Sequence, residues 1–196
     1  MFRVPATIAA IFLIAFGGAM LTAVYALKAT IGFGSIAIGP WTAWPLAQTE
    51  QADPYAKAHR ARAGQLLLGD AEGLVFVASS DSAGSRLSGN CDYVVSGRTP
   101  PARFWTLHTT GTDEALLQVD QSFPAAYHSQ NVLKTQKGEF SIGVSGQPKP
   151  GNWLATGETS RPFKLVLTLF DTPTAGSSRL IELQMPEILR EECRDG

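Results

Sequence analysis

The sequence predicts a mainly β protein: a jelly-roll-like antiparallel β-sandwich with one short helix, preceded by an N-terminal transmembrane helix. Three observations support this fold class. Residues 4–27 contain no charged side chain. A helical pattern follows at 53–69, and from Gly73 onward apolar residues recur with the two-residue period of a strand. Many short strands separated by Gly, Pro and Ser turns, with little helix, are typical of a sandwich or jelly roll.

The N-terminal apolar run is long enough to span a bilayer. A helix over residues 4–27 would be about 36 Å long, against a hydrocarbon core of about 30 Å. Charges are absent because each costs roughly 2.5 kcal/mol or more at the bilayer centre. A cleaved secretory signal is the alternative, since Arg3 precedes the run and "VYA" before Leu27 fits a cleavage site. A signal core of about 7 to 15 residues is shorter, which favours the anchor. Under both interpretations, the rest of the chain is exported from the cytoplasm.

The run therefore divides the chain into three expected parts. Residues 1–28 form the anchor or signal, residues 29–52 a juxtamembrane linker, and residues 53–196 the β-sandwich domain. The short helix is expected at the start of that domain. Asp53 is a good N-cap, Pro54 suits the first helical position, and Gly69 is a plausible end.

The strands follow this helix. Alternating or apolar segments bounded by turn residues predict strands within the ranges 73–81, 87–97, 102–111, 115–119, 130–136, 139–146, 162–171 and 179–189. "KG" at 137–138 is expected to join two of them as a hairpin. In "PFKLVLTLFD", Phe163, Leu165 and Leu167 share one face, as the core side of a strand requires.

Charge and cysteine content restrict the partners and the compartment. The formal net charge is −1 and no basic patch stands out, so a nucleic-acid partner is not expected. Cys91 and Cys193 form an even pair in an exported chain, which predicts a disulfide. Closing a loop of about 100 residues contributes up to about 4.7 kcal/mol in the chain-entropy model. Two unpaired thiols, one buried and one in a frayed end, are the alternative.

Motifs for metal, cofactor or hydrolytic chemistry are not evident. His59, His108 and His128 are dispersed, and no two have metal-ligand spacing. No G-x-S-x-G motif occurs. A loose G-x-G-x-x-A spacing at residues 32–37 follows the apolar run rather than a strand, so no dinucleotide site is expected. We therefore expect neither a metal nor a cofactor, and the sequence identifies no catalytic residue.

Two segments carry candidate ligand-binding residues. In "ARFWTLHTTG", strand alternation puts Arg103 and Trp105 on one face, where a ring and a guanidinium can bind an anion or a sugar acid. In "QPKPGNWLATG", Asn152 and Trp153 can form the floor of a pocket. Each segment has a structural alternative: a two-sided strand with Trp105 in the core, and a loop that plugs one end of the sandwich.

The segments "CDYVVSGRTPPARFWTLHTTG" and "GEFSIGVSGQPKPGNWLATGETSRPFKLVLTLFDTP" resemble the bacterial family called domain of unknown function 1214. The resemblance extends over roughly residues 40–193. This chain has "NWLAT" where the family usually has proline after the leucine, and Thr168 and Phe170 where an Arg and a Tyr are usual.

The resemblance implies a jelly-roll-like β-sandwich, and often a companion domain of unknown function, number 1254, in the same or a neighbouring chain. It implies no reaction. We therefore expect a single-pass protein of the bacterial inner membrane with its C-terminal domain in the periplasm. There it would act as an accessory binding or scaffolding module, with a companion-domain protein as a possible partner. An enzyme acting on carbohydrate or another envelope component is the alternative.

Overall fold

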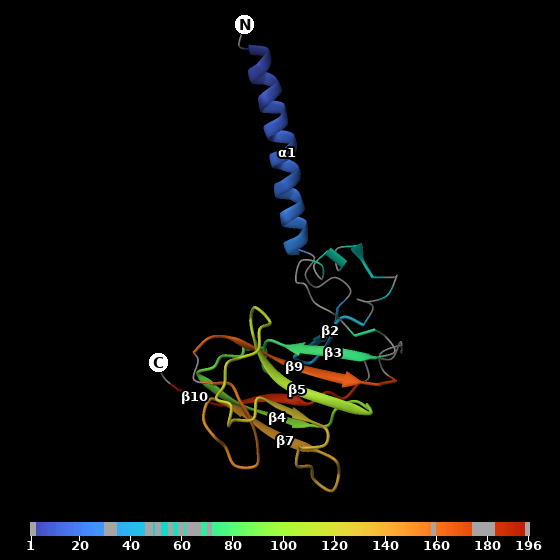
Figure 1. Cartoon of the computed structure of the whole chain (residues 1–196), viewed down its shortest axis with the longest axis vertical. Helices are drawn as coiled ribbons and strands as arrows, with labels where there is room; N and C mark the ends of the chain where they lie inside the picture. Colours follow the sequence, from blue (N-terminus) through green and yellow to red (C-terminus); the bar gives the residue numbers. More distant parts are fainter. Residues whose placement is uncertain are drawn as a thin grey trace.

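The computed structural model describes residues 3–29, 35–45, 49, 52–54, 57–58, 61, 68–69, 72–157, 160–173 and 183–194. The first element, α1 (Arg3–Ala29), is a helix that projects from the rest of the molecule (Figure 1). Its segment Val4–Ala26 is long and apolar enough to cross a membrane, and none of it is buried against the remainder of the protein. By its length and composition, the helix is a candidate membrane span.

The described strands form two sheets that pack face to face, which confirms the predicted mainly β sandwich (Figure 1). The six-stranded sheet has the order β1-β2-β3-β9-β5-β6, and the four-stranded sheet has the order β10-β4-β7-β8. The strands of the first sheet are β1 (Ile36–Ile38), β2 (Trp41–Ala43), β3 (Gly73–Ala78), β9 (Phe163–Phe170), β5 (Phe104–Gly111) and β6 (Ala126–His128). Those of the second are β10 (Glu187–Cys193), β4 (Cys91–Gly97), β7 (Phe140–Ser145) and β8 (Asn152–Ala155).

The core lies between the two sheets and follows the strand alternation. In β9, Leu165, Leu167 and Leu169 are at most 1% exposed, as expected for one face of a strand. Trp41 of β2 is fully buried, and its Nε1 donates to the carbonyl oxygen of Pro186 at 2.7 Å. This bond joins the six-stranded sheet to the segment that enters β10. Trp41 therefore packs onto the domain.

Several expectations need correction or lie outside the described residues. The expected strand at 115–119 is reduced to an isolated bridge between Thr110 and Leu116, and that at 130–136 to a bridge between Lys134 and Phe140. β8 forms inside a segment expected to be a loop, and it pairs in parallel with β7, whereas the sequence predicted antiparallel pairing throughout. Residues 36–43 of the expected linker form β1 and β2. Most of the predicted helix at 53–69, with His59, lies outside the described residues, as do residues 32–34.

Candidate functional site

A cleft lies over the outer face of the four-stranded sheet, on the side away from the core. It has a volume of about 570 Å³ and is open to solvent. The outward residues of β4, β7 and β10 form its floor, and two loops form its walls. The lining residues are Val94, Leu133, Lys134, Thr135, Glu139, Ser141, Gly143, Lys149, Pro150, Gly151, Asn152 and Glu191.

A glycine of β7, Gly143, lies in the lining of the cleft beneath the stem of Lys149. A Cβ on Gly143 would lie 3.5 Å from Cβ of Lys149, so the lysine stem rests on the bare backbone of the strand. Pro148 and Pro150 restrict the loop that carries Lys149. Gly151 has a φ of 82°, a conformation that favours glycine, and it turns the chain into β8.

Lys149 holds one wall of the cleft through two ion pairs. Its Nζ lies 2.8 Å from Asp92 Oδ2 and 3.1 Å from Glu191 Oε2. The hydrogen bond to Asp92, followed by that to Glu191, raises the pKa of Lys149. The two carboxylates come from neighbouring strands, β4 and β10. The ammonium group therefore ties the 146–151 loop to both strands and is already neutralised.

Asn152 is the second structural support of the cleft. Its Oδ1 accepts a hydrogen bond from the Leu133 N–H at 2.8 Å. Its Nδ2 donates to the carbonyl oxygens of Leu133 and Ser141, both at 2.9 Å. The side-chain amide has thus used both of its donors to fix the 131–135 loop against β7 and β8. Asn152 lines the cleft, and these bonds make it a support of the wall.

Trp153 is 7% exposed and does not line the cleft. Its Nε1 donates to Oγ of Ser145 at 3.0 Å, and its backbone N–H donates to the Tyr127 hydroxyl at 3.0 Å. Its ring meets that of Phe123 edge to face, with the centroids 5.0 Å apart. The side chain therefore packs between the 123–127 segment and β7.

Arg103 and Trp105 do not form a common binding face. Arg103 precedes β5, and its side chain is 83% exposed, with a 3.6 Å ion pair to Asp171. Trp105 is 3% exposed and packs against Phe140, with ring centroids 5.2 Å apart. Trp105 has an indirect link to the cleft, because the Lys134 ammonium lies 5.8 Å from its ring centroid. Of the four predicted residues, the cleft lining includes Asn152 alone.

Sequence reasoning missed the charged residues that shape the cleft. Asp92, Lys149 and Glu191 are far apart in the sequence, and their pairing depends on the neighbour relation of β4 and β10. The one available signal is the Pro-Lys-Pro-Gly segment at 148–151, a restricted loop that places a lysine just before Asn152 and Trp153. Glu139, on the opposite wall, is paired with Arg98 at 3.3 Å.

The described histidines lie on the other sheet. His108 and His128 occupy β5 and β6, and neither lines the cleft. Burial lowers the pKa of His108. Within the described residues, no group of three or more His, Cys, Asp or Glu side chains is arranged to hold a metal ion. The cleft thus combines paired charges with a floor that includes Val94, Ser141 and Gly143.

The predicted disulfide is present. Cys91 and Cys193 are bonded and face each other across β4 and β10, with their Cα atoms 3.9 Å apart. The bridge lies next in sequence to Asp92 and close to Glu191, the two carboxylates that hold Lys149. It therefore supports the same wall of the cleft.

Comparisons with known proteins agree with the fold. The family model described as protein of unknown function (DUF1214) matches residues 72–174, which is more than half of the chain. The match extends from the residue before β3 to just beyond β9, so it leaves out α1, β1, β2 and β10. A search of curated proteins finds no match.

Two crystal structures are similar to this chain. The VPA0106 protein from Vibrio parahaemolyticus has 25% sequence identity and a TM-score of 0.58, with 72% of this chain and 36% of that chain covered. A putative uncharacterized protein from Burkholderia cenocepacia has 18% identity and a TM-score of 0.42, with 76% and 46% covered. The present chain therefore spans less than half the length of either protein.

Proposed function

The chain belongs to the family of proteins of unknown function DUF1214, and because that description carries no activity, we propose from the structure that it is a membrane-anchored binding module. In this proposal α1 is retained in the bacterial inner membrane and the sandwich lies in the periplasm. The cleft over the four-stranded sheet receives the partner. The observation that carries the proposal is α1, an apolar helix that buries nothing against the sandwich.

The proposed compartment is supported by the disulfide and by the charge pattern. Disulfides persist in oxidising compartments such as the periplasm and are rare in the cytosol. Residues 30–56, which follow α1, contain no Lys or Arg, and short cytoplasmic segments next to a span usually carry an excess of both. Residues 1–28 act as the anchor in this proposal, and the binding domain extends to residue 196.

A binding role has more support than an enzymatic one. The cleft is lined by Lys, Glu, Ser and Asn side chains, several of which already bond to each other or to the backbone. His108 and His128, the groups best suited to proton transfer near neutral pH, lie on the other sheet. We propose that the partner is a protein carrying the companion domain 1254, as the family resemblance implies.

Membrane retention is tested by fractionating cells that express the full chain and a chain that starts at residue 30. The full chain should remain in the membrane pellet after alkaline carbonate extraction and show no shortening by mass spectrometry. The truncated chain should be soluble. Release of the full chain by carbonate, or a mature N-terminus after Ala26, would contradict the anchor.

Partner binding is tested by replacing one exposed cleft residue. Ser141→Arg places a long charged side chain in the cleft, and Ala83→Arg places the same side chain on an exposed turn outside the cleft lining. We expect Ser141→Arg to reduce co-purification of the companion-domain protein at least tenfold, and Ala83→Arg to leave it unchanged. Equal co-purification with both variants would exclude the cleft as the contact surface.

A further inference from the structure

The outer face of the six-stranded sheet is almost free of charge. Strand register identifies which side chains point outward on this sheet, since neighbouring strands place paired residues on the same face. Lys164 is the charged residue among the described outward set, and Glu114 neutralises it at 3.1 Å. The remaining outward residues are Ala37, Thr42, Val75, Val77, Phe104, Thr106, His108, Thr110, Ala126, His128, Val166, Thr168 and Phe170.

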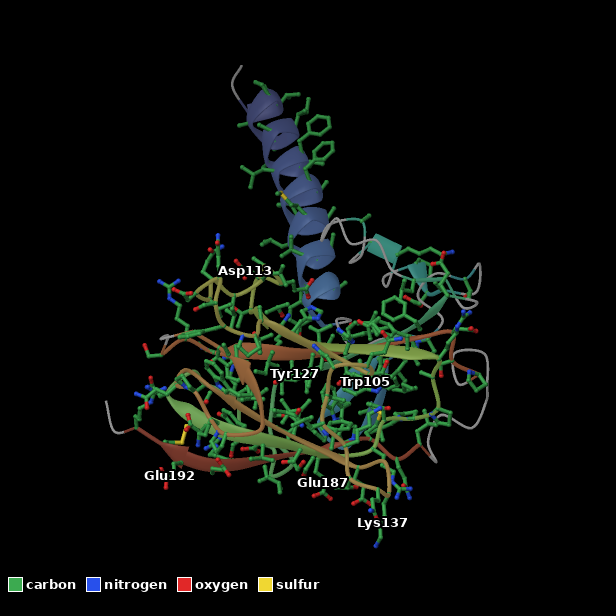
Figure 2. The ribbon with its side chains drawn as sticks, turned by 60° about the horizontal axis from the view of Figure 1, so that its bottom comes forward. Trp105, Asp113, Tyr127, Lys137, Glu187 and Glu192 are labelled. Atoms are coloured by element: carbon green, nitrogen blue, oxygen red, sulfur yellow. A yellow bond between two sulfur atoms is a disulfide. The ribbon has the colours of Figure 1, made fainter. Side chains whose placement is uncertain are left out.

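The two outer faces of the sandwich therefore differ. The four-stranded sheet presents Asp92, Glu187 and Glu191 outward, as expected for a sheet that faces water. Figure 2 shows Glu187 and Glu192 on that side of the molecule, and Trp105 and Tyr127 between the layers. An antiparallel sheet with one solvated face normally alternates apolar and polar residues. The six-stranded sheet instead has apolar or uncharged residues on both faces.

Aromatic rings gather at one end of this uncharged face. The Phe104 ring lies 5.9 Å from the Phe170 ring and 5.5 Å from the His128 ring, measured between centroids. Burial lowers the pKa of the neighbouring His108, which favours its neutral form. Phenylalanine is one of the residues that amphipathic elements bury at the boundary between lipid headgroups and acyl chains.

The anchor places this face close to the bilayer. Figures 1 and 2 both show α1 leaving the sandwich on the side of the six-stranded sheet, with the four-stranded sheet on the opposite side. α1 ends at Ala29 and β1 begins at Ile36, in that same sheet. Seven residue steps span at most about 25 Å even when fully extended. The first strand of the uncharged face is therefore tethered close to the membrane end of the helix.

We propose that the outer face of the six-stranded sheet rests on the surface of the lipid bilayer beside α1. This inference rests on the proposed membrane anchor. Its partner is the interfacial region of neutral or zwitterionic lipids, because the face offers apolar and aromatic contact and no cluster of positive charge. The contact turns the cleft on the opposite sheet away from the membrane, toward a partner.

The test uses the full chain in phosphatidylcholine liposomes. Cys91 and Cys193 are joined, so one added cysteine supplies a unique thiol for an environment-sensitive fluorophore. Ala126→Cys puts it at an exposed, outward position on β6, and Ser141→Cys puts it at an exposed position on the opposite sheet. With nitroxide groups on the lipid headgroups, we expect at least twofold quenching at residue 126 and little at residue 141. Equal quenching at the two positions would overturn the proposal.

The second part of the test places a charge on the outer face of the six-stranded sheet. Thr106→Asp, of nearly equal size, should abolish the difference in quenching between residues 126 and 141, and Ser141→Asp should leave the signal at residue 126 unchanged. If the fluorophore at residue 126 reports an apolar environment even without lipid or detergent, another part of the same chain covers the sheet face. If that signal grows with the protein-to-lipid ratio, a second copy of the chain covers it. Either result contradicts the proposal.

The two proposals fail separately. If carbonate extraction releases the full chain, the anchor is absent and the lipid contact has no basis. If the chain is retained but the label at residue 126 is not quenched, the anchor stands and the contact of the sheet face is rejected. Thermal unfolding of each labelled chain verifies that the sandwich is folded during the measurement.

Discussion

At the residue scale, polar side chains in the most distinctive segments of this protein mainly support the backbone. The sequence predicts Asn152 and Trp153 as the floor of a pocket. Their hydrogen bonds go instead to Leu133, Ser141 and Ser145. A buried polar group must be bonded to something, and the protein supplies the partner here.

Asn152→Ala tests this structural role. The substitution removes three hydrogen bonds and leaves the partly buried backbone groups of Leu133 and Ser141 without this partner. An unsatisfied buried polar group costs about 1 to 3 kcal/mol. Because each group here incurs only part of that cost, we expect the free energy of unfolding to fall by about 2 to 3 kcal/mol. Chemical denaturation measures the loss. An unchanged midpoint would show that the amide is dispensable to the fold.

Lys149→Met tests the wall of the cleft. The substitution keeps the stem on Gly143 but leaves Asp92 and Glu191 close together without a cation. We expect a loss of about 1 kcal/mol that becomes smaller in 1 M salt, since the pairs are partly exposed. Because the pKa of Lys149 is raised in the folded protein, its ion pairs stabilise the fold fully below the usual pKa of 10.5. This stabilisation is lost as the pH rises above that value. A variant as stable as the wild type at pH 7 would contradict the ion-pair role.

His108→Val tests the effect of burial on titration. Burial lowers the pKa of His108, so the folded protein disfavours the charged imidazole. The stability of the wild type is then complete above the usual pKa of 6.5 and falls as the pH drops below it. We expect the variant to lose less stability than the wild type between pH 6.5 and about 5. Thermal unfolding across this range provides the measurement, and parallel pH profiles would contradict the expectation.

At the scale of single elements, the edge strand β10 depends on the disulfide and on its neighbours. Cys193 pairs with Cys91 near the end of β10, after an irregularity that follows Arg190. The Ile188 N–H donates to Oγ of Ser82, and Arg190 is paired with the buried Asp81 at 3.0 Å. The 81–86 turn thus covers the free edge of β10, which protects it from pairing with other chains.

Replacing both cysteines by serine tests the bridge. The disulfide closes a sequence separation of 102 residues, and removing such a bridge costs about 2 to 5 kcal/mol. We expect a marked fall in Tm and increased proteolysis near residue 190, since β10 then keeps only its non-covalent contacts. The wild type under reducing conditions should behave like the double variant. Equal Tm values for the oxidised and cysteine-free proteins would contradict the expectation.

The strands were predicted well where burial alternates and poorly where it does not. β5 and β9 have a clear two-residue period, and their limits are close to the expected 102–111 and 162–171. All four residues of β8 are buried, so it shows no alternation, and prolines just before it indicated a loop. β8 becomes a strand because it pairs with β7, a contact between separate segments.

At the scale of the whole molecule, α1 and the sandwich are expected to be independent in stability. The span Val4–Ala26 is not buried against the rest of the protein. A chain that starts at residue 30 should therefore unfold within about 2 °C of the full chain in detergent, because it loses no core contact. Differential scanning calorimetry measures both. A large decrease in Tm would show that the helix contributes to the folding of the sandwich.

The sequence by itself determined the apolar N-terminal helix, the β class, the alternating core strands and the pairing of Cys91 with Cys193. These depend on local period, on segment length, or on there being two cysteines in the chain. Tertiary structure alone decided the cleft, its charged wall and the uncharged outer face of the six-stranded sheet. Each of these arises where segments distant in sequence become neighbours in a sheet, and strand order and register are not encoded in local periodicity.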